Sequence, residues 1–189
     1  MKIKKAFDIC KKNKNISIFC NDVGEQWLSD GYAVYPIFGL PRLNEDYICK
    51  LYDINDAQRD KISFTISQSK PLINVEDCTQ NESVAEMWDI SIVYDGKVML
   101  PISTEEGLMF IDRTYLNPFM DTPNETMVLT LRKDIKGTPY FAVKFGMVAY
   151  GFICAYEIVD DDFVKQLWSL YFESEIILKN KKGNADETV

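Results

Sequence analysis

The chain has 189 residues, enough for one ordinary domain or two small ones, and 47% of them are hydrophobic, so global disorder is excluded. Its 21 Lys and Arg residues against 29 Asp and Glu residues give a formal net charge of −8, which excludes a protein that is basic over its whole surface. Histidine is absent from the sequence, and this excludes Ser-His-Asp and Cys-His triads, histidine-ligated zinc and imidazole acid–base catalysis.

The cysteines and the apolar runs indicate a cytoplasmic protein. The five cysteines are widely spaced and form no CxxC pair, which argues against a zinc ribbon or a disulfide scaffold and favours small buried side chains. The N-terminal lysines are followed by no apolar segment of signal-peptide length. The longest apolar run, Phe145–Tyr156, is well short of the ~20 residues that span a bilayer, so no membrane partner is expected.

Residues 1–15 have the periodicity of an amphipathic helix. At 100° per residue, one side of this helix is apolar and consists of Ile3, Ala6, Phe7, Ile9 and Cys10. The other side carries Lys4, Lys5, Lys11 and Lys12. The spacing predicts a helix that buries one side and presents ammonium groups on the other.

Short strands and short helices are expected over the rest of the first half. Alternating apolar residues and turn sequences predict strands over 16–20, 25–28, 32–38 and 62–66. Pro36 restricts its strand to a sheet edge or a bulge. Asn44 is a good N-cap for a helix over Glu45–Leu51, and residues 55–61 are expected to form a further helical turn.

The second half opens with the clearest hairpin signal in the chain. Asp95-Gly96 separates apolar alternation over 90–94 from that over 98–100. A short helix is expected within 115–120. Further strands are predicted over 127–131, 140–144 and 148–158.

Three consecutive aspartates, Asp160 to Asp162, are expected to begin the last helix. A metal site is the alternative interpretation, but adjacent carboxylates on a helix point in different directions, so N-capping is favoured. The apolar residues of this helix can share one broad side, which would consist of Phe163, Val164, Leu167, Leu170, Tyr171 and Ile177.

The expected fold class is therefore α+β, with antiparallel sheets, a basic N-terminal helix and an amphipathic C-terminal helix. The polar, irregular residues 67–83 suggest a boundary between two halves. The predicted organisation is an α+β half over 1–83, an α+β half over 84–182 that ends in a helix, and a disordered tail over 183–189.

The charge distribution is the most informative functional signal. Residues 1–15 hold six lysines and one aspartate, a net charge of +5, so the other 174 residues carry −13. Lysines along one helix face can contact phosphate oxygens without reading bases, and such binding is independent of sequence and sensitive to salt. Lys4, Lys5, Lys11 and Lys12 are the candidate DNA-phosphate-binding residues. The alternative is a solvated helix face that keeps the protein soluble.

The sequence offers no catalytic or metal-binding constellation. Phosphate-loop, dinucleotide-binding, zinc-protease and nucleophile-elbow motifs are absent from it. We therefore expect a non-enzyme that has no cofactor and no metal.

Several segments of the chain occur in an order that a known family shares. They are 110–120 (FIDRTYLNPFM), 122–123 (TP), 127–131 (MVLTL), 139–144 (PYFAVK) and 148–158 (VAYGFICAYEI). This order resembles the closing segment of DNA sliding clamps, of both the proliferating-cell-nuclear-antigen type and the bacterial polymerase beta-subunit type. Residues 28–34 (LSDGYAV), which follow a lysine-rich helix and a strand, resemble the opening of a clamp domain.

The resemblance covers about half of the chain and implies a clamp-like fold and a non-catalytic processivity or scaffold role in DNA replication, in a phage or a mobile element. It implies duplex DNA as a sequence-independent partner, a polymerase or another protein as a second partner, and a homo-oligomer if a ring closes. The chain departs from the family because a helix of about twenty residues follows the last strand. The alternative function is a cytosolic adaptor or inhibitor that binds protein and contacts no nucleic acid.

Overall fold

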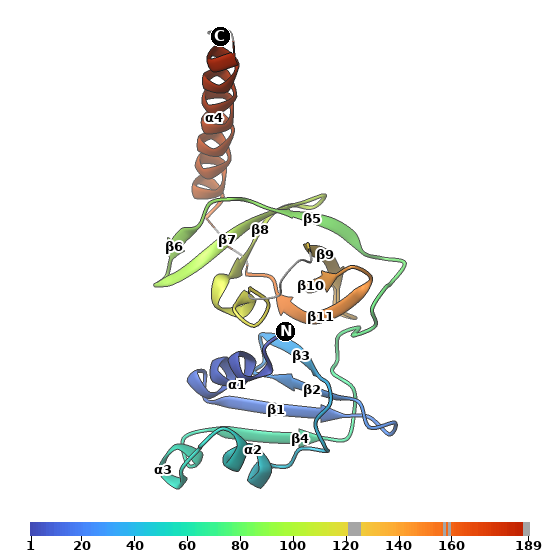
Figure 1. The fold of residues 1–189 in the computed structure, drawn as a ribbon. Helices are drawn as coiled ribbons and strands as arrows, with labels where there is room; N and C mark the ends of the chain where they lie inside the picture. The colour runs from blue at the N-terminus through green and yellow to red at the C-terminus, as the bar shows by residue number, and fades with distance from the viewer. Residues whose placement is uncertain (121–125, 157, 159, 187–189) are drawn as a thin grey trace. The chain divides into compact units, whose positions relative to one another are not determined.

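The computed structural model describes residues 1–120, 126–156, 158 and 160–186, and for residues 175 and 177–186 it describes the backbone. Contacts divide the chain into two compact units, Met1–Tyr156 and Glu157–Val189. Figure 1 shows the helices and strands of both units. The first unit contains all the strands of the described residues, and the second consists mainly of one helix.

The first part of the larger unit is a small sheet with three helices. Its elements are α1 (Ile3–Lys12), β1 (Asn15–Cys20), β2 (Gln26–Ser29), β3 (Ala33–Ile37), α2 (Glu45–Leu51), α3 (Asp56–Arg59) and β4 (Ser63–Ser67). The predicted helix, strands and caps of this region are confirmed. Asn44 caps α2 by accepting a hydrogen bond from the backbone N–H of Tyr47, and Asn55 and Gln58 form a capping box on α3.

The second part of this unit is almost entirely β-structure. Its elements are β5 (Ser83–Met87), β6 (Ile92–Tyr94), β7 (Lys97–Thr104), β8 (Gly107–Asp112), the 3-10 helix η1 (Arg113–Leu116), β9 (Met127–Lys133), β10 (Pro139–Phe145) and β11 (Val148–Cys154). The Asp95-Gly96 hairpin is confirmed, with both turn residues at positive φ. The short helix expected within 115–120 begins earlier, at Arg113. Thr122 and Pro123 lie outside the described residues.

The strands form one large, mostly antiparallel sheet, as the α+β prediction requires. Its order is β4-β1-β2-β3-β11-β10-β9-β5-β7-β6, and β8 pairs with β7. One pairing corrects the expectation of purely antiparallel sheets, because β1 and β4 are parallel. The two helices α2 and α3 lie between β3 and β4 in the chain, and a long connection of this kind allows β4 to return in the same direction as β1.

Pro36 lies in β3, which is an interior strand of the sheet. β11 pairs only with Ala33 and Val34 of β3, whereas β2 pairs with the whole stretch that includes Pro36. The segment around Pro36 therefore has a strand on one side only, and the missing N–H leaves no gap in a ladder.

The chain that follows β11 pairs with β8, an earlier strand of the second part. Phe110 of β8 forms an antiparallel bridge with Tyr156, two residues beyond the end of β11. The Tyr156 N–H donates to the Phe110 carbonyl at 2.6 Å. Since β8 pairs with β7, and β7 leads through β5, β9 and β10 to β11, this bridge brings the strands close to a closed barrel.

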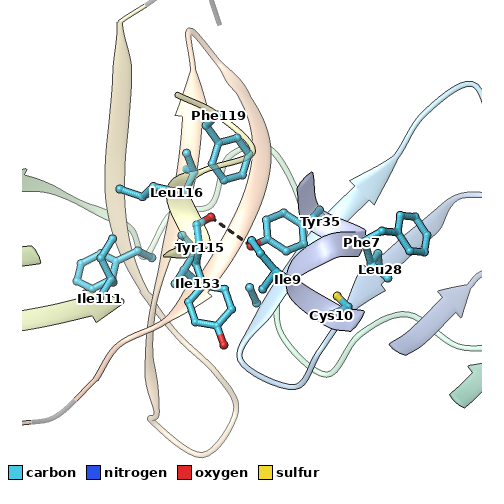
Figure 2. Packing of buried hydrophobic residues seen from close by; sticks show 14 of the residues in the cluster. Phe7, Ile9, Cys10, Leu28, Tyr35, Ile111, Tyr115, Leu116, Phe119 and Ile153 are labelled. Carbon is cyan, nitrogen blue, oxygen red and sulfur yellow. Dashed lines mark hydrogen bonds between the residues drawn. The ribbon is translucent and has the colours of Figure 1, made fainter. Parts of the chain in front are cut away.

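The main core lies between the strands and the helices α1 and η1, and Figure 2 shows its centre. Phe119 is fully buried there, beside the rings of Tyr35 and Phe145. A Cβ on Gly151 of β11 would come within 2.5 Å of the Phe119 ring, so glycine is required for this ring to lie against the sheet. The cluster joins both parts of the unit, because it includes residues of α1, β3, η1 and β11.

The opposite face of β10 and β11 is covered by the polar residues 68–82. Tyr140, Ala142, Ala149 and Phe152 pack there against Ile73 and Val75 of this segment. Arg132 of β9, which is 2% exposed, donates to the backbone carbonyls of Glu76 and Asp77 and to the Glu82 carboxylate. Residues 68–82 are thus bound to the sheet by a buried guanidinium.

The Glu82 carboxylate connects two buried cations. Arg132 lies 2.5 Å from Oε2 and Lys144 lies 2.8 Å from Oε1. Burial raises the pKa of Glu82, but hydrogen bonds from Lys144 and Arg132 outweigh this effect and hold the pKa below its usual range. The charged form is therefore the one that the folded protein stabilises.

The second unit contains α4, which spans Asp161–Asp186. The expected capping is confirmed, since the Asp160 carboxylate accepts from the Phe163 N–H at 3.0 Å. The prediction of one apolar side is incomplete, because Phe172 and Ile176 lie on the side opposite Phe163 and Leu170 at 100° per residue. Of the tail expected over 183–189, residues 183–186 are in α4 and 187–189 lie outside the described residues.

Two strands, β5 and β8, were not expected from the sequence. In β8, Phe110 and Ile111 are neighbours and both are buried, so the strand lacks the alternation that marks a half-exposed strand. The segment of β5 is short and mostly exposed, which gives an equally weak signal.

Removing the Glu82 carboxylate should leave two buried cations without compensation. We expect Glu82→Ala to lower the free energy of unfolding at pH 7 by about 3–5 kcal/mol, measured by urea denaturation. Because its pKa is depressed in the folded protein, this stabilisation is present above the pKa of an unfolded glutamate, about 4.3, and is lost as pH falls through the folded value.

Glu76→Ala is the matched control, because Glu76 forms a 3.0 Å ion pair with Lys70 on the surface. This variant should lose less than about 1 kcal/mol. Equal losses of unfolding free energy for the two variants would show that the buried ion pairs of Glu82 with Arg132 and Lys144 do not stabilise the fold more than a surface pair.

Candidate nucleic-acid interface

The N-terminal helix α1 is fixed to the sheet by its apolar side. Ala6, Phe7, Ile9 and Cys10 are buried, as predicted, and the helix packs against β1, β2, β3 and η1. The Phe7 ring stacks on Tyr52 with centroids 3.9 Å apart. The polar side is thereby held outward in one orientation. Figure 1 shows the helix lying on its sheet.

A buried carboxylate fixes the end of this helix. Asp30, in the turn between β2 and β3, is 3% exposed. One oxygen accepts from Asn13, the C-cap of α1, at 2.6 Å and from the Tyr115 hydroxyl at 3.0 Å. The other oxygen accepts from the backbone N–H groups of Tyr32 and Ala33. Four donors therefore satisfy the carboxylate where α1, the β2–β3 turn and η1 meet.

The tyrosines around Asp30 connect the two parts of the unit. The Tyr35 hydroxyl donates to the Tyr115 carbonyl at 3.1 Å, the bond drawn in Figure 2. Burial and then the Asp30 charge raise the pKa values of both Tyr35 and Tyr115. Burial and Asp30 also raise the pKa of Cys10. These shifts keep the phenols and the thiol neutral, which suits a structural cluster and not an activated nucleophile.

Four lysines surround a hollow of about 340 Å³ at the C-terminal end of α1. They are Lys11 and Lys12 of the last helical turn, Lys14 of the turn into β1, and Lys61 before β4. Asp8, Gln58 and Ile62 complete the lining. We call this feature the lysine hollow. Its charged side chains sum to +3, so it favours an anion.

The parallel pairing of β1 and β4 brings Lys61 into the lysine hollow. Asn15 at the start of β1 lies beside Ser63 at the start of β4. The Ser63 N–H donates to the Lys14 carbonyl at 2.9 Å. Lys14 itself adopts a φ of +56° in the tight turn that ends α1. The residues that precede the two strands therefore meet at one edge of the sheet, although 47 positions separate Lys14 from Lys61 in the sequence.

The outward side of α1 carries all four predicted residues, Lys4, Lys5, Lys11 and Lys12. They do not all line the same hollow. Lys11 and Lys12 line the lysine hollow. Lys5 and Lys12 line a second hollow of about 530 Å³, together with Asp8, Ile9, Thr114 and Asn117. Lys4 is exposed one turn before Asp8. Lys14 and Lys61 were not among the predicted site residues, and only the β1–β4 pairing could have indicated Lys61.

The surroundings limit how far the positive surface extends. Lys11 also reaches the Tyr52 carbonyl, at 3.5 Å, where α2 ends. Beyond it lies an acidic region of α2 and α3, where Arg59 forms ion pairs with Glu45 and Asp46. The positive surface is therefore a short strip along α1 and the adjoining turns.

A further hollow in the described chain is lined by more carboxylates than cations and is therefore less favourable for an anion. A hollow of about 880 Å³ borders residues 78–83 and β9, and four carboxylates in its lining outnumber the two cations there: Glu82, Glu105, Glu106 and Asp134 against Arg132 and Lys133. Within residues 1–120, 126–156, 158 and 160–186, no group of three or more His, Cys, Asp or Glu residues is arranged to hold a metal ion.

Comparison of the chain with protein-family models, with curated proteins and with solved structures finds no match in any of the three. Among the described residues, no helix combines the length and the apolar character that a membrane span needs.

The Asp30 cluster predicts a specific response to loss of the Tyr115 hydroxyl. Tyr115→Phe should lower the free energy of unfolding at pH 7 by about 1–2 kcal/mol, because Asp30 then loses one buried donor. Since the pKa of Tyr115 is raised in the folded protein, the wild-type stabilisation is present below about pH 10, the pKa of an unfolded tyrosine, and is lost as pH rises through the folded value.

Denaturant titrations at pH 7 and above pH 10 measure both effects. Tyr32→Phe is the control, because Tyr32 is 62% exposed, and it should change stability by less than about 0.5 kcal/mol. A Tyr115→Phe variant as stable as wild type would show that the hydroxyl does not hold the cluster together.

Proposed function

We propose that this protein is a non-catalytic, DNA-associated protein that binds duplex DNA through its phosphates along α1 and the adjoining turns. The observation that carries the proposal is the lysine hollow, in which Lys11, Lys12, Lys14 and Lys61 converge from three separate segments. If the lysines only kept the helix soluble, they would be needed on its outer side and not in the adjoining turns. The added lysines of the turns concentrate positive charge at one place on a molecule of net charge −8.

The chemistry of this surface suits the phosphate backbone and not the bases. Lysine ammonium groups are flexible point charges that contact phosphate oxygens without fixed geometry. The strip offers no cluster of exposed aromatic residues on which bases could stack, since Phe7 is buried and stacked on Tyr52. Binding should therefore be independent of sequence, with a dissociation constant of roughly 1–100 µM at physiological salt.

The role that we propose for this binding is clamp-like, a processivity or scaffold function in the cytoplasm. It rests on the resemblance of the second half to the closing segment of sliding clamps, together with the basic helix on an acidic body. The acidic body would repel DNA everywhere except at the strip, which orients the protein on the duplex. A polymerase or another replication protein would be the second partner.

The proposal is tested by titrating duplexes of unrelated sequence with the protein at several salt concentrations. Wild-type binding should weaken steeply with salt, with a slope of about −0.9 per phosphate contact. Changing Lys11, Lys12, Lys14 and Lys61 to Ala should weaken binding at low salt by at least about tenfold and make the slope shallower by up to about 3.6. Lys4→Ala with Lys5→Ala tests whether the contact extends along α1.

The matched control changes the same amount of charge elsewhere, at Lys70, Lys97, Lys133 and Lys136. If binding is localised to α1, this control should keep nearly all of the affinity. Equal losses in the two quadruple variants would indicate an unlocalised charge effect. An absence of binding by wild type at low salt would contradict the proposal and favour the adaptor or inhibitor that contacts no nucleic acid.

A further inference from the structure

The strand β4 (Ser63–Ser67) forms one end of the sheet, and within the described residues β1 is the strand that pairs with it. Figure 1 shows β4 at the border of the sheet in the first part of the larger unit. Sheet edges are usually protected by charged residues or proline, because their free N–H and C=O groups can pair with another chain. Residues 62–69 (ISFTISQS) contain neither a charged residue nor a proline, so this edge lacks that protection.

The pairing with β1 determines which backbone groups of β4 point outward. The Ser63 N–H donates to the Lys14 carbonyl at 2.9 Å, so the backbone groups of Ser63 point toward β1. The direction alternates along a strand, and Thr65 therefore also points its N–H and C=O groups toward β1. The N–H and C=O groups of Phe64 and Ile66 point the other way, toward the free edge.

The side chains at this edge leave apolar surface exposed. Phe64 and Ile66 lie beside Ile16 and Ile18 of β1, which are buried, so all four side chains belong to the core face of the sheet. Phe64 is half-buried, but Ile66 is 45% exposed. The three hydroxyl-bearing residues of β4 lie on the opposite face. The edge thus combines outward backbone groups with an apolar side chain that is only partly covered.

The sequence of β4 indicates which partner fits this edge. Its residues alternate between hydroxyl and apolar side chains, S-F-T-I-S, and the pattern is symmetric about Thr65. If the strand pairs antiparallel with a copy of itself centred on Thr65, position 64 lies opposite 66 and position 63 opposite 67. Each side chain then faces one of its own class, and aromatic with β-branched or hydroxyl with hydroxyl are favourable cross-strand pairs.

The backbone agrees with the same register. In an antiparallel pair, two residues that lie opposite each other exchange hydrogen bonds only when both point their backbone groups at the partner strand. Phe64 and Ile66 are the outward residues, and this register places them opposite each other. A shift by one position would set an outward residue against an inward one and would remove these bonds.

We propose that β4 pairs antiparallel with β4 of a second copy of this chain, about a two-fold axis at Thr65. Phe64 of each copy exchanges two backbone hydrogen bonds with Ile66 of the other. The two Thr65 residues meet at the axis as a pair without hydrogen bonds, with Cα atoms about 4.5 Å apart. The sheet continues from one copy into the other, and each exposed Ile66 gains Phe64 of the other copy as a neighbour.

The arrangement is closed, because a two-fold contact uses the same edge of both copies. It differs from a head-to-tail ring, and it does not depend on the proposed binding of DNA. Beyond the strands, Lys61 of one copy comes toward Lys70 of the other, whose charge is balanced by Glu76 at 3.0 Å. A contact of one short strand fits a weak, reversible dimer, with a dissociation constant of roughly 10–100 µM.

Disulfide cross-linking tests the register. In a Cys78→Ser background, which removes an exposed thiol, Thr65→Cys should link most of the protein into a covalent dimer under mild oxidation at about 200 µM. Ser63→Cys is the matched control, because the two copies of position 63 would lie about 14 Å apart, four residues along the strands. The control should remain monomeric on a non-reducing gel.

Sedimentation equilibrium of the full chain, under reducing conditions and without DNA, tests the association itself. Wild type should be a monomer–dimer equilibrium, and Thr65→Lys should weaken dimerisation at least about tenfold, because two ammonium groups would lie directly opposite each other. Val93→Lys is the control, since Val93 is 77% exposed on β6 at the other end of the sheet. It should change the dissociation constant by less than about twofold. Circular dichroism verifies that both variants keep the fold.

Three results would overturn the proposal. The first is a wild-type chain that stays monomeric at about 500 µM. The second is equal cross-linking of the Thr65→Cys and Ser63→Cys variants. The third is a dimer that Thr65→Lys weakens no more than Val93→Lys does.

Discussion

The buried Asp30 carboxylate is the constraint on which the proposed interface depends. It accepts hydrogen bonds from Asn13 at the end of α1, from the β2–β3 turn and from Tyr115 of η1. Removing it from water is offset only when all of these donors are in place, so the three elements are fixed together. The direction of the last turn of α1 determines where Lys11, Lys12 and Lys14 lie. The buried cluster around Asp30 therefore determines the position of these lysines on the surface.

The candidate site could be predicted from the sequence only in part. The periodicity of residues 1–15 correctly separated the buried residues, such as Phe7 and Cys10, from the lysines, because both sets lie on one helix. Lys61 could not be predicted, since its approach to Lys14 depends on a parallel pairing that forms only after two helices have reversed the chain. Asp30 lies between two predicted strands, and none of its neighbours in the sequence indicates that Tyr115, 85 positions away, donates to it.

The same contrast between local and distant interactions holds for the fold. Caps and turns, such as Asn44 before α2 and Asp95-Gly96 between β6 and β7, were predictable because neighbouring residues determine them. Because residues 67–83 are polar and irregular, the sequence predicts a boundary between two halves there, which includes residues 68–82. They are instead bound to the sheet by Arg132, whose partners lie some 50 positions earlier in the chain. Where polar residues are ordered by a buried cation, hydrophobic patterning carries no signal.

We propose that duplex DNA contacts the protein along α1 and the adjoining turns. Titration of isotope-labelled protein with a short duplex, followed by amide and lysine side-chain NMR signals, tests this directly. We expect fast-exchange shifts concentrated at residues 4–14 and 58–62 that disappear as salt is raised, with the signals of α4 unchanged. Shifts centred on another surface, or none at low salt, would contradict it.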